Sequence, residues 1–129
     1  MQLRKSTPVL IVDAIEPSLA FWRQRLGFES PVEVPHDGKL GFVILTNGVI
    51  EVMYQTAASV DAEAPAILHG WRNDKSFLYI EVDDIDAVAT ALDGFEIVLP
   101  RRRTFYGATE IGYREPAGHL VTFAQRGTK

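Results

Sequence analysis

The sequence predicts an α+β protein in which one strand–helix–three-strand unit (βαβββ) is written twice within a single domain, residues 1–129. Two observations support this fold class. Short β-prone runs alternate with two segments whose apolar residues recur every three or four positions, as on one face of a helix. The pattern then restarts further along the chain, because Val12 to Val82 and Ile15 to Ile85 are both offsets of 70 residues. A repeat of this size indicates one supersecondary unit present in two copies, neither able to bury its sheet alone.

The first copy, at about residues 5–56, opens with a β-prone run at Thr7–Val12 and continues into a helix at about Pro17–Leu26. Proline is favoured in the first turn of a helix, where its missing N–H has no intrahelical partner to lose. Apolar residues spaced by three and four then form the face that we expect to be buried, namely Leu19, Trp22 and Leu26. Gly27 ends this predicted helix.

Three further strands complete the first copy. One begins at Phe28, the next spans Leu40–Leu45, and the last spans Val49–Gln55. The segments between them, His36–Gly38 and Thr46–Gly48, contain the Asp-Gly and Asn-Gly pairs that favour tight turns. The pattern therefore predicts two consecutive hairpins.

A connector at about residues 57–75 leads to the second copy, at about residues 76–126. The connector is polar and rich in alanine, and we expect it to be partly helical. The second copy begins with a strand at Phe77–Val82 and a helix at about Ile85–Leu92. A Gly-Phe pair closes both predicted helices, at Gly94 in this copy. The remaining predicted strands are Arg102–Tyr106, Thr109–Arg114 and His119–Gln125.

Composition restricts the possible functions. The net charge of −4 and the isoelectric point near 5.3 argue against nucleic-acid binding, which requires a basic surface. The absence of cysteine excludes disulfides, thiolate metal sites and a cysteine nucleophile. No apolar run is long enough to span a membrane, and the N-terminal residues lack the apolar region of a signal peptide. We therefore expect a cytoplasmic protein with no membrane partner.

Three stretches carry a family resemblance: VDAIEPSLAFWRQRLGFE (Val12–Glu29), FLYIEVDDIDAVATAL (Phe77–Leu92) and REPAGHLVTFAQ (Arg114–Gln125). Together with the intervening strands, they resemble the glyoxalase, bleomycin-resistance and extradiol-dioxygenase superfamily, also called the vicinal oxygen chelate (VOC) family. The third stretch resembles the family's D-P-x-G turn, with Glu115 in place of aspartate. The resemblance implies paired βαβββ modules whose curved mixed sheets surround a cleft. It also implies a homodimer, since many members of the family are homodimers.

Metal-dependent members of the family take their ligands from four strand positions. Carried over to this sequence, those positions are Thr7, Glu51, Phe77 and Thr122. Only Glu51 is a usual metal-ligand type, whereas divalent metals normally need three or more protein donors. We therefore expect no metal and no cofactor. A substitute site built from Glu51, Glu81 and His69 is the alternative.

Period-two alternation predicts the faces of the strands. On the last strand, His119 and Phe123 lie on one face and Thr122 lies on the other, so we expect His119 to face away from the cleft and to be structural. The same alternation, together with the position of Trp71 on the connector, predicts a set of ligand-binding residues. These are Thr7, Val9, Glu51, Met53, Trp71, Phe77, Tyr79, Glu81 and Thr122.

Each predicted site residue has a plainer interpretation. Apolar side chains with a few polar groups are typical of a small-molecule pocket, but Met53, Phe77 and Tyr79 could equally fill a core. Trp71 is either a lid contact or an anchor for the connector. Glu81 is either a functional carboxylate or the partner of an arginine. The basic run Arg101–Arg103 and the aromatic residues Phe105, Tyr106 and Tyr113 are likewise either ligand contacts or ordinary surface and packing residues.

An inward-facing carboxylate costs free energy unless it is paired or solvated, so Glu51 and Glu81 suggest an open cleft or a cationic ligand. If these two carboxylates face each other, their repulsion would raise one pKa and produce a proton-transfer group. Glu51 and Glu81 are therefore the candidate catalytic residues, although neither is assigned.

The expected function is metal-free binding of a small molecule, cationic or aromatic, as in the bleomycin-resistance-type, antibiotic-sequestering branch of the family. The alternative is a glyoxalase- or dioxygenase-like enzyme, a lyase or isomerase, with an altered metal site that uses Glu51. A third possibility is an interaction module whose ancestral site has been lost.

Overall fold

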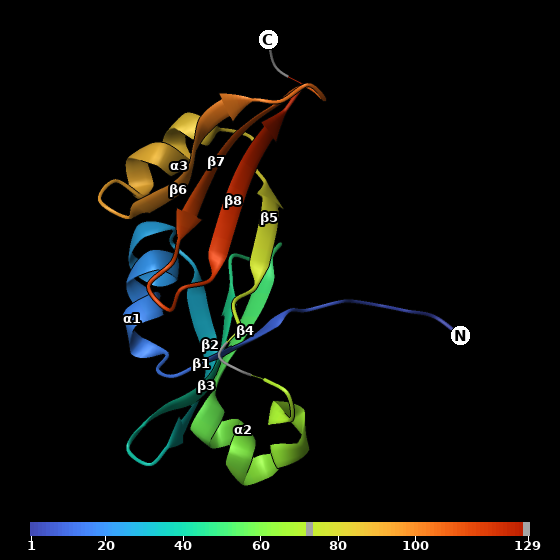
Figure 1. Ribbon diagram of the computed structural model, residues 1–129, viewed down its shortest axis with the longest axis vertical. Coiled ribbons are helices and arrows are strands. Elements are labelled where there is room, and N and C mark those ends of the chain that lie inside the picture. The colour runs from blue at the N-terminus through green and yellow to red at the C-terminus, as the bar shows by residue number, and fades with distance from the viewer. Residues whose placement is uncertain (72–73, 128–129) are drawn as a thin grey trace. The chain divides into compact units, whose positions relative to one another are not determined.

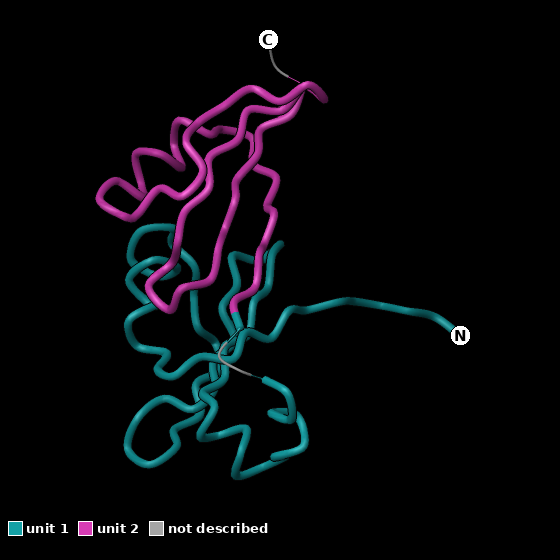
Figure 2. The backbone as a smooth tube through the Cα atoms, viewed as in Figure 1, with its two compact units in different colours: residues 1–74 teal, residues 75–129 magenta. Residues whose placement is uncertain are grey.

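The computed structural model describes residues 1–71 and 74–127. It divides into two compact units, Met1–Asp74 and Lys75–Lys129 (Figure 2). Each unit contains a four-stranded mixed sheet in a βαβββ arrangement, which confirms the predicted α+β class (Figure 1). No helix within the described residues is long and apolar enough to cross a membrane.

The first unit has its strands in the order β1-β4-β3-β2. Strand β1 pairs in parallel with β4, while β3 pairs antiparallel with both β4 and β2. The predicted connector is indeed partly helical, since α2 and η2 follow the last strand (Figure 1). The elements are β1 (Val9–Val12), α1 (Glu16–Leu19), η1 (Ala20–Arg25), β2 (Glu29–His36), β3 (Lys39–Thr46), β4 (Glu51–Thr56), α2 (Ala57–Glu63) and η2 (Pro65–Leu68).

The first predicted helix is present, but its winding and its buried face differ from the prediction. The α-helical turn α1 continues without a break into η1, which is a π-helix. Phe21 and Trp22 are adjacent in sequence, and both are fully buried. Ser18 is also buried, whereas the predicted face residues Leu19 and Leu26 are only half-buried. A regular α-helical face therefore does not describe this segment.

Trp22 is the centre of the core of the first unit. Its Nε1–H donates a hydrogen bond of 2.9 Å to the hydroxyl of Tyr54 on β4. Its ring also lies 5.3 Å from that of Phe21 and 5.0 Å from that of Phe28, measured between centroids. Because both partners of the hydrogen bond are fully buried, this bond attaches the helix to one face of the sheet.

The second unit repeats this topology with the strand order β5-β8-β7-β6, in which β5 and β8 are parallel. Asp84 caps helix α3, since its Oδ1 accepts a hydrogen bond of 3.1 Å from the Ala87 N–H. The predicted buried face of this helix, Ile85, Val88 and Leu92, is confirmed. The elements are β5 (Phe77–Glu81), α3 (Ile85–Ala91), β6 (Glu96–Arg103), β7 (Ala108–Arg114) and β8 (Leu120–Arg126).

The predicted strand Arg102–Tyr106 is wrong, because β6 covers Glu96–Arg103 and the chain turns immediately afterwards. Thr104 closes the turn by accepting the Gly107 N–H at its carbonyl, 3.2 Å, and the Ala108 N–H at its hydroxyl, 3.0 Å. Gly107 has a φ of 85°, which favours glycine. Pro100 does not prevent strand formation here, because β6 is an edge strand.

His119 faces the helix-bearing side of the second sheet, as predicted. It is buried, and its Nδ1 accepts a hydrogen bond of 2.8 Å from the Ser76 N–H. Its own backbone N–H donates to Oε1 of Glu115 at 2.7 Å. His119 and Glu115 therefore stabilise the turn before β8.

The Trp22–Tyr54 hydrogen bond generates a stability prediction. Replacing Tyr54 with phenylalanine keeps the ring but leaves the buried Trp22 N–H without an acceptor. The free energy of unfolding should fall by about 1–3 kcal/mol, the usual cost of an unsatisfied buried donor. Urea denaturation measures this loss. Phe105→Leu, at a fully exposed position, is the control and should change the stability by less than about 0.5 kcal/mol. A Tyr54→Phe variant as stable as the parent protein would contradict the assignment.

Candidate functional site

Within residues 75–127 of the second unit, one face of the sheet is covered by α3 and the other face carries no helix of that unit. The first turn of α3 lies on the side of Gln125, whose Oε1 accepts the Ile85 N–H at 2.8 Å. Residues opposite one another on paired strands point to the same side of a sheet. The helix-free face therefore carries three cross-strand rows. These rows are Phe77–Leu120–Arg114–Glu96, Tyr79–Thr122–Gly112–Leu99 and Glu81–Ala124–Glu110–Arg102.

A pocket of about 250 Å³ lies on this face. Gly112 forms part of its lining. A Cβ atom at this position would lie 2.8 Å from Thr122 Oγ1 and 2.9 Å from Leu99 Cβ. Both distances are too short for real contacts, so the side chains of neighbouring strands approach here only because residue 112 has none. The lining includes Phe77, Leu99, Arg102, Gly112, Leu120 and Thr122.

Next to the pocket, four hydrogen bonds converge on the carboxylate of Glu110, which is only 1% exposed. Oε1 accepts from Arg102 Nε at 3.2 Å and from Arg102 Nη2 at 3.0 Å. Oε2 accepts from the hydroxyls of Tyr79 and Tyr106. A carboxylate offers about four lone-pair positions, so Glu110 is saturated by this cluster of Glu110, Arg102, Tyr79 and Tyr106.

The electrostatics of the cluster fix its protonation state at neutral pH. Burial by itself raises the pKa of Glu110, but the hydrogen bonds from Tyr106, Tyr79 and Arg102 outweigh it and hold the pKa below its ordinary value. The hydrogen bond to Glu110 and the burial of the phenol both raise the pKa of Tyr79. The cluster therefore contains an ionised carboxylate, a protonated Tyr79 and a charged guanidinium, an arrangement suited to holding Arg102 in place.

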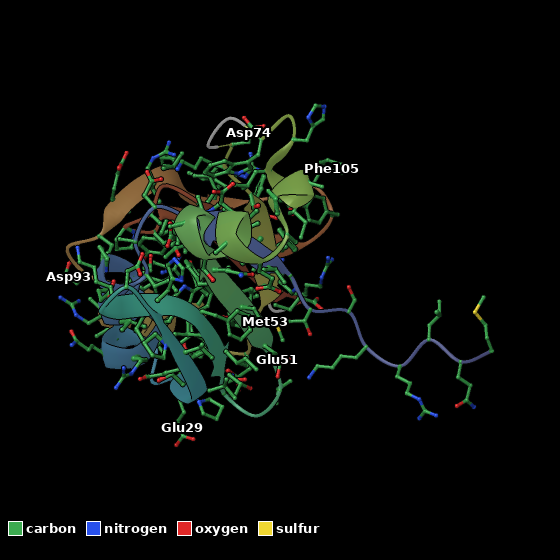
Figure 3. All side chains as sticks on the ribbon, turned by 90° about the horizontal axis from the view of Figure 1, so that it is seen from below. Glu29, Glu51, Met53, Asp74, Asp93 and Phe105 are labelled. Atoms are coloured by element: carbon green, nitrogen blue, oxygen red, sulfur yellow. The ribbon has the colours of Figure 1, made fainter. Side chains whose placement is uncertain are left out.

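In the first unit, Glu51 and Met53 lie on the same strand, β4 (Figure 3). Val9 of β1 pairs with Met53. Oε1 of Glu51 lies 2.9 Å from the Lys5 ammonium and accepts a hydrogen bond of 3.0 Å from the Thr7 hydroxyl. The contacts with Lys5 and then Thr7 lower the pKa of Glu51. This direction is opposite to the raised pKa that a proton-transfer group would need.

Glu81 forms an ion pair with Arg126, which agrees with the plainer interpretation of this residue. The guanidinium of Arg126 also lies 5.8 Å from the centroid of the Tyr106 ring, within range of a cation–π contact. Glu81 is thus connected through Arg126 to the edge of the Glu110 cluster.

A model of the Glyoxalase/Bleomycin resistance protein/Dioxygenase superfamily matches residues 6–123. The chain belongs to this superfamily. Solved structures with the same fold include TioX from Micromonospora sp. ML1, with a TM-score of 0.79, 18% identity, and coverage of 96% of this chain and 99% of TioX. Lactoylglutathione lyase from Agrobacterium tumefaciens matches with a TM-score of 0.74, 21% identity, and coverage of 97% and 95%.

A glyoxalase/bleomycin resistance protein/dioxygenase from Nocardioides matches with a TM-score of 0.76 and 17% identity, and the alignment covers 100% of this chain and 89% of that one. At these identities, the structural matches show a shared fold. No curated protein is significantly similar in sequence to this chain.

The residues at the superfamily's metal-ligand positions do not fit a metal. Phe77 has no donor atom, and hydroxyl groups such as those of Thr7 and Thr122 are poor neutral ligands. Glu51 already accepts from a lysine cation and a hydroxyl. Within residues 1–71 and 74–127, no three His, Cys, Asp or Glu side chains lie together as a metal-binding group.

The structure brings together only some of the predicted site residues. Phe77 and Thr122 line the pocket, and Tyr79 belongs to the adjacent cluster. Trp71 is half-buried in the first unit, and its backbone N–H donates to the Leu68 carbonyl at 2.9 Å. Of the other predicted residues, Thr7, Val9, Glu51 and Met53 belong to the first unit, and Glu81 lies beside Arg126 in the second.

Sequence reasoning missed Glu110, Gly112 and Leu99. Glu110 and Gly112 alternate along β7 with residues of the opposite face, so period-two analysis of that strand would have placed both on one face. The pairing of Gly112 with Thr122 depends on the register of β7 and β8. Arg102 was recognised only as part of a basic run. Its pairing with Glu110 depends on the register of β6, which the sequence analysis placed incorrectly.

The Glu110 cluster predicts a pH dependence of stability. Because the folded-state pKa of Glu110 is lowered, its stabilisation is fully present above the unfolded-state pKa of about 4.3 and is lost as the pH falls through the folded-state pKa. Urea denaturation between about pH 7 and pH 3 should show a smaller acid loss for Glu110→Gln than for the parent protein. Glu29→Gln, at an exposed position, is the matched control and should retain the parental slope. Equal slopes for Glu110→Gln and the parent protein would contradict this assignment.

Proposed function

We propose that this protein binds a small molecule in the pocket on the helix-free face of the second sheet. The pocket itself carries the proposal, because a concave site with mostly apolar lining and a few polar groups is typical of ligand binding. Phe77 offers a ring that is 63% exposed, which costs free energy in water and is available for contact with an aromatic ligand.

The volume of the pocket limits the part of the ligand that it can hold. An enclosed apolar cavity of about 150 Å³ accepts benzene. A pocket of about 250 Å³ therefore has room for an aromatic body of one or two rings. A larger ligand would extend beyond the lining residues.

Binding is favoured over catalysis because the candidate bases are already paired. Glu51 lies against Lys5, Glu81 against Arg126 and Glu110 against Arg102. The pairing of Glu51 with Lys5 and Thr7 also disfavours the alternative of a lyase or isomerase with an altered metal site. The same pairings weaken the expectation of a cationic ligand, which depended on glutamates without a counter-ion.

Calorimetric titration with 2-naphthalenemethanol, a neutral two-ring probe, tests the proposal. We expect saturable binding with one site per chain. Leu120→Trp should weaken it at least tenfold, because the indole would occupy space in the pocket. Ala87→Trp, at an exposed position on α3, which covers the opposite face of the same sheet, is the control and should bind as the parent protein does. Equal binding by Leu120→Trp and Ala87→Trp would place the probe elsewhere and contradict the proposal.

The same titration separates metal-free binding from the enzyme alternative. Protein treated with a chelator should bind the probe unchanged and should melt at the same temperature, because loss of a bound metal would remove its contribution to stability. One tightly held transition metal per chain, with loss of probe binding after chelation, would make the enzyme the better assignment.

We further propose a homodimer, which would cover apolar side chains on strand edges. The edge strand β2 carries exposed Val32 and Val34, and the edge strand β6 carries exposed Ile97 and Val98. Exposed apolar edges favour association with another chain. Sedimentation equilibrium at micromolar concentration should give about twice the chain mass of 14.4 kDa. A mass of 14.4 kDa across that range would contradict the dimer.

A further inference from the structure

Arg102 is the charged residue in the lining of the pocket, and hydrogen bonds to Glu110 hold its guanidinium group in place. Only two of the five guanidinium N–H groups, on Nε and Nη2, donate to Glu110. The side chain is 55% exposed and forms part of the pocket lining, so its remaining donors can contact a ligand there. Arg102 thus combines a fixed orientation with free hydrogen-bonding capacity.

The acceptor that orients Arg102 is itself immobilised. Glu110 is buried, and the hydroxyls of Tyr79 and Tyr106 hold its second oxygen. Tyr79 comes from β5, Arg102 from β6 and Tyr106 from the turn after β6, so three segments support one guanidinium. A side chain that is already ordered loses little conformational entropy when a ligand binds.

Thr122 supplies a second polar group to the same pocket. The residue is only 3% exposed, yet none of the residues that the structure describes forms a hydrogen bond with its hydroxyl. No completely buried side-chain oxygen or nitrogen lacks a partner within the described part of the chain. The Thr122 hydroxyl must therefore be reachable from the pocket, where it can donate to a ligand.

The charges around the pocket disfavour a cation there. The acidic side chains of the helix-free face are paired, Glu110 with Arg102, Glu81 with Arg126 and Glu96 with Arg114. A cation in the pocket would meet a guanidinium, whereas these three described carboxylates of the face already have cationic partners. A carboxylate would instead meet two donors, and charge-assisted hydrogen bonds to arginine are stronger than neutral ones.

We propose that the pocket selects aromatic carboxylates, with the carboxylate held by Arg102 and Thr122 and the rings held against Phe77 and Leu120. This inference rests on the proposed function, since it assigns the ligand class of the same pocket. Glu110, Tyr79 and Tyr106 act as positioning residues that do not touch the ligand.

Three probes with one aromatic body test this selectivity by calorimetric titration: 2-naphthoate, 2-naphthalenemethanol and the 2-naphthylmethylammonium ion. 2-Naphthoate should bind about tenfold more tightly than the alcohol, as expected for a charge-assisted bond in place of a neutral one, and the ammonium probe should bind most weakly. Arg102→Gln should reduce the affinity for 2-naphthoate about tenfold and leave that for the alcohol within about twofold.

Two further variants keep the test independent of damage to the cluster. Arg103→Gln removes the same charge from the next position on β6, where Nη1 lies 3.4 Å from Thr109 Oγ1 on the other face, and should leave the selectivity intact. Thr122→Val keeps the shape of the side chain but removes its hydrogen-bond donor, and should reduce the affinity for 2-naphthoate several-fold.

The possible failures are distinguishable. If the alcohol binds and 2-naphthoate binds no more tightly, or if Arg102→Gln weakens all three probes equally, the carboxylate selectivity is wrong while the proposed function stands. Selectivity that survives both Arg102→Gln and Thr122→Val also overturns the assignment of these residues. If none of the three probes binds, the proposed function itself fails, and the selectivity fails with it.

Discussion

The carboxylate of Glu110 is the constraint on which the candidate site depends. An ionised group this deeply buried is tolerated only if hydrogen bonds replace its lost hydration, and here four donated hydrogen bonds do so. The donors come from β5, β6 and the turn after β6, so satisfying one carboxylate fixes how these segments meet β7. The same hydrogen bonds leave one edge of Arg102 free. The hydrogen bonds of Glu110 thus both stabilise the sheet and orient Arg102.

The two copies of the repeat share a topology but use it differently. In the first unit, the helix is anchored by the buried hydrogen bond between Trp22 and Tyr54. In the second unit, a polar network lies on the opposite face of the sheet, and Gly112 lets Thr122 and Leu99 approach each other in the lining of the pocket beside it. A duplicated βαβββ unit therefore supplies two sheets, while individual side chains decide which sheet carries a site.

Membership of the superfamily defines the fold more closely than the chemistry. The structural matches retain the architecture at identities of 18% and 21%, where side chains at a site are free to differ. The metal-ligand pattern of the superfamily illustrates this freedom. At the one position that keeps a ligand type, Glu51, the chain supplies its own cation, Lys5, at 2.9 Å. An internal ammonium group thereby pairs with the carboxylate that the family resemblance places at a metal-ligand position.

The sequence by itself determined the features that depend on short-range periodicity. The repeat, the span of both helices, the turns at Asp37-Gly38 and Asn47-Gly48, and the face of the second sheet on which His119 lies all follow from spacing and turn chemistry. Only the tertiary structure decided the register of β6, and with it the cluster that joins Tyr79 to Glu110 across 31 positions of sequence. Thr104 and Gly107 set that register by closing the turn earlier than the β-prone residues suggested. The physical reason is that periodicity identifies the face of a strand, whereas the partners across a sheet are selected by turn geometry and by the pairing of buried polar groups.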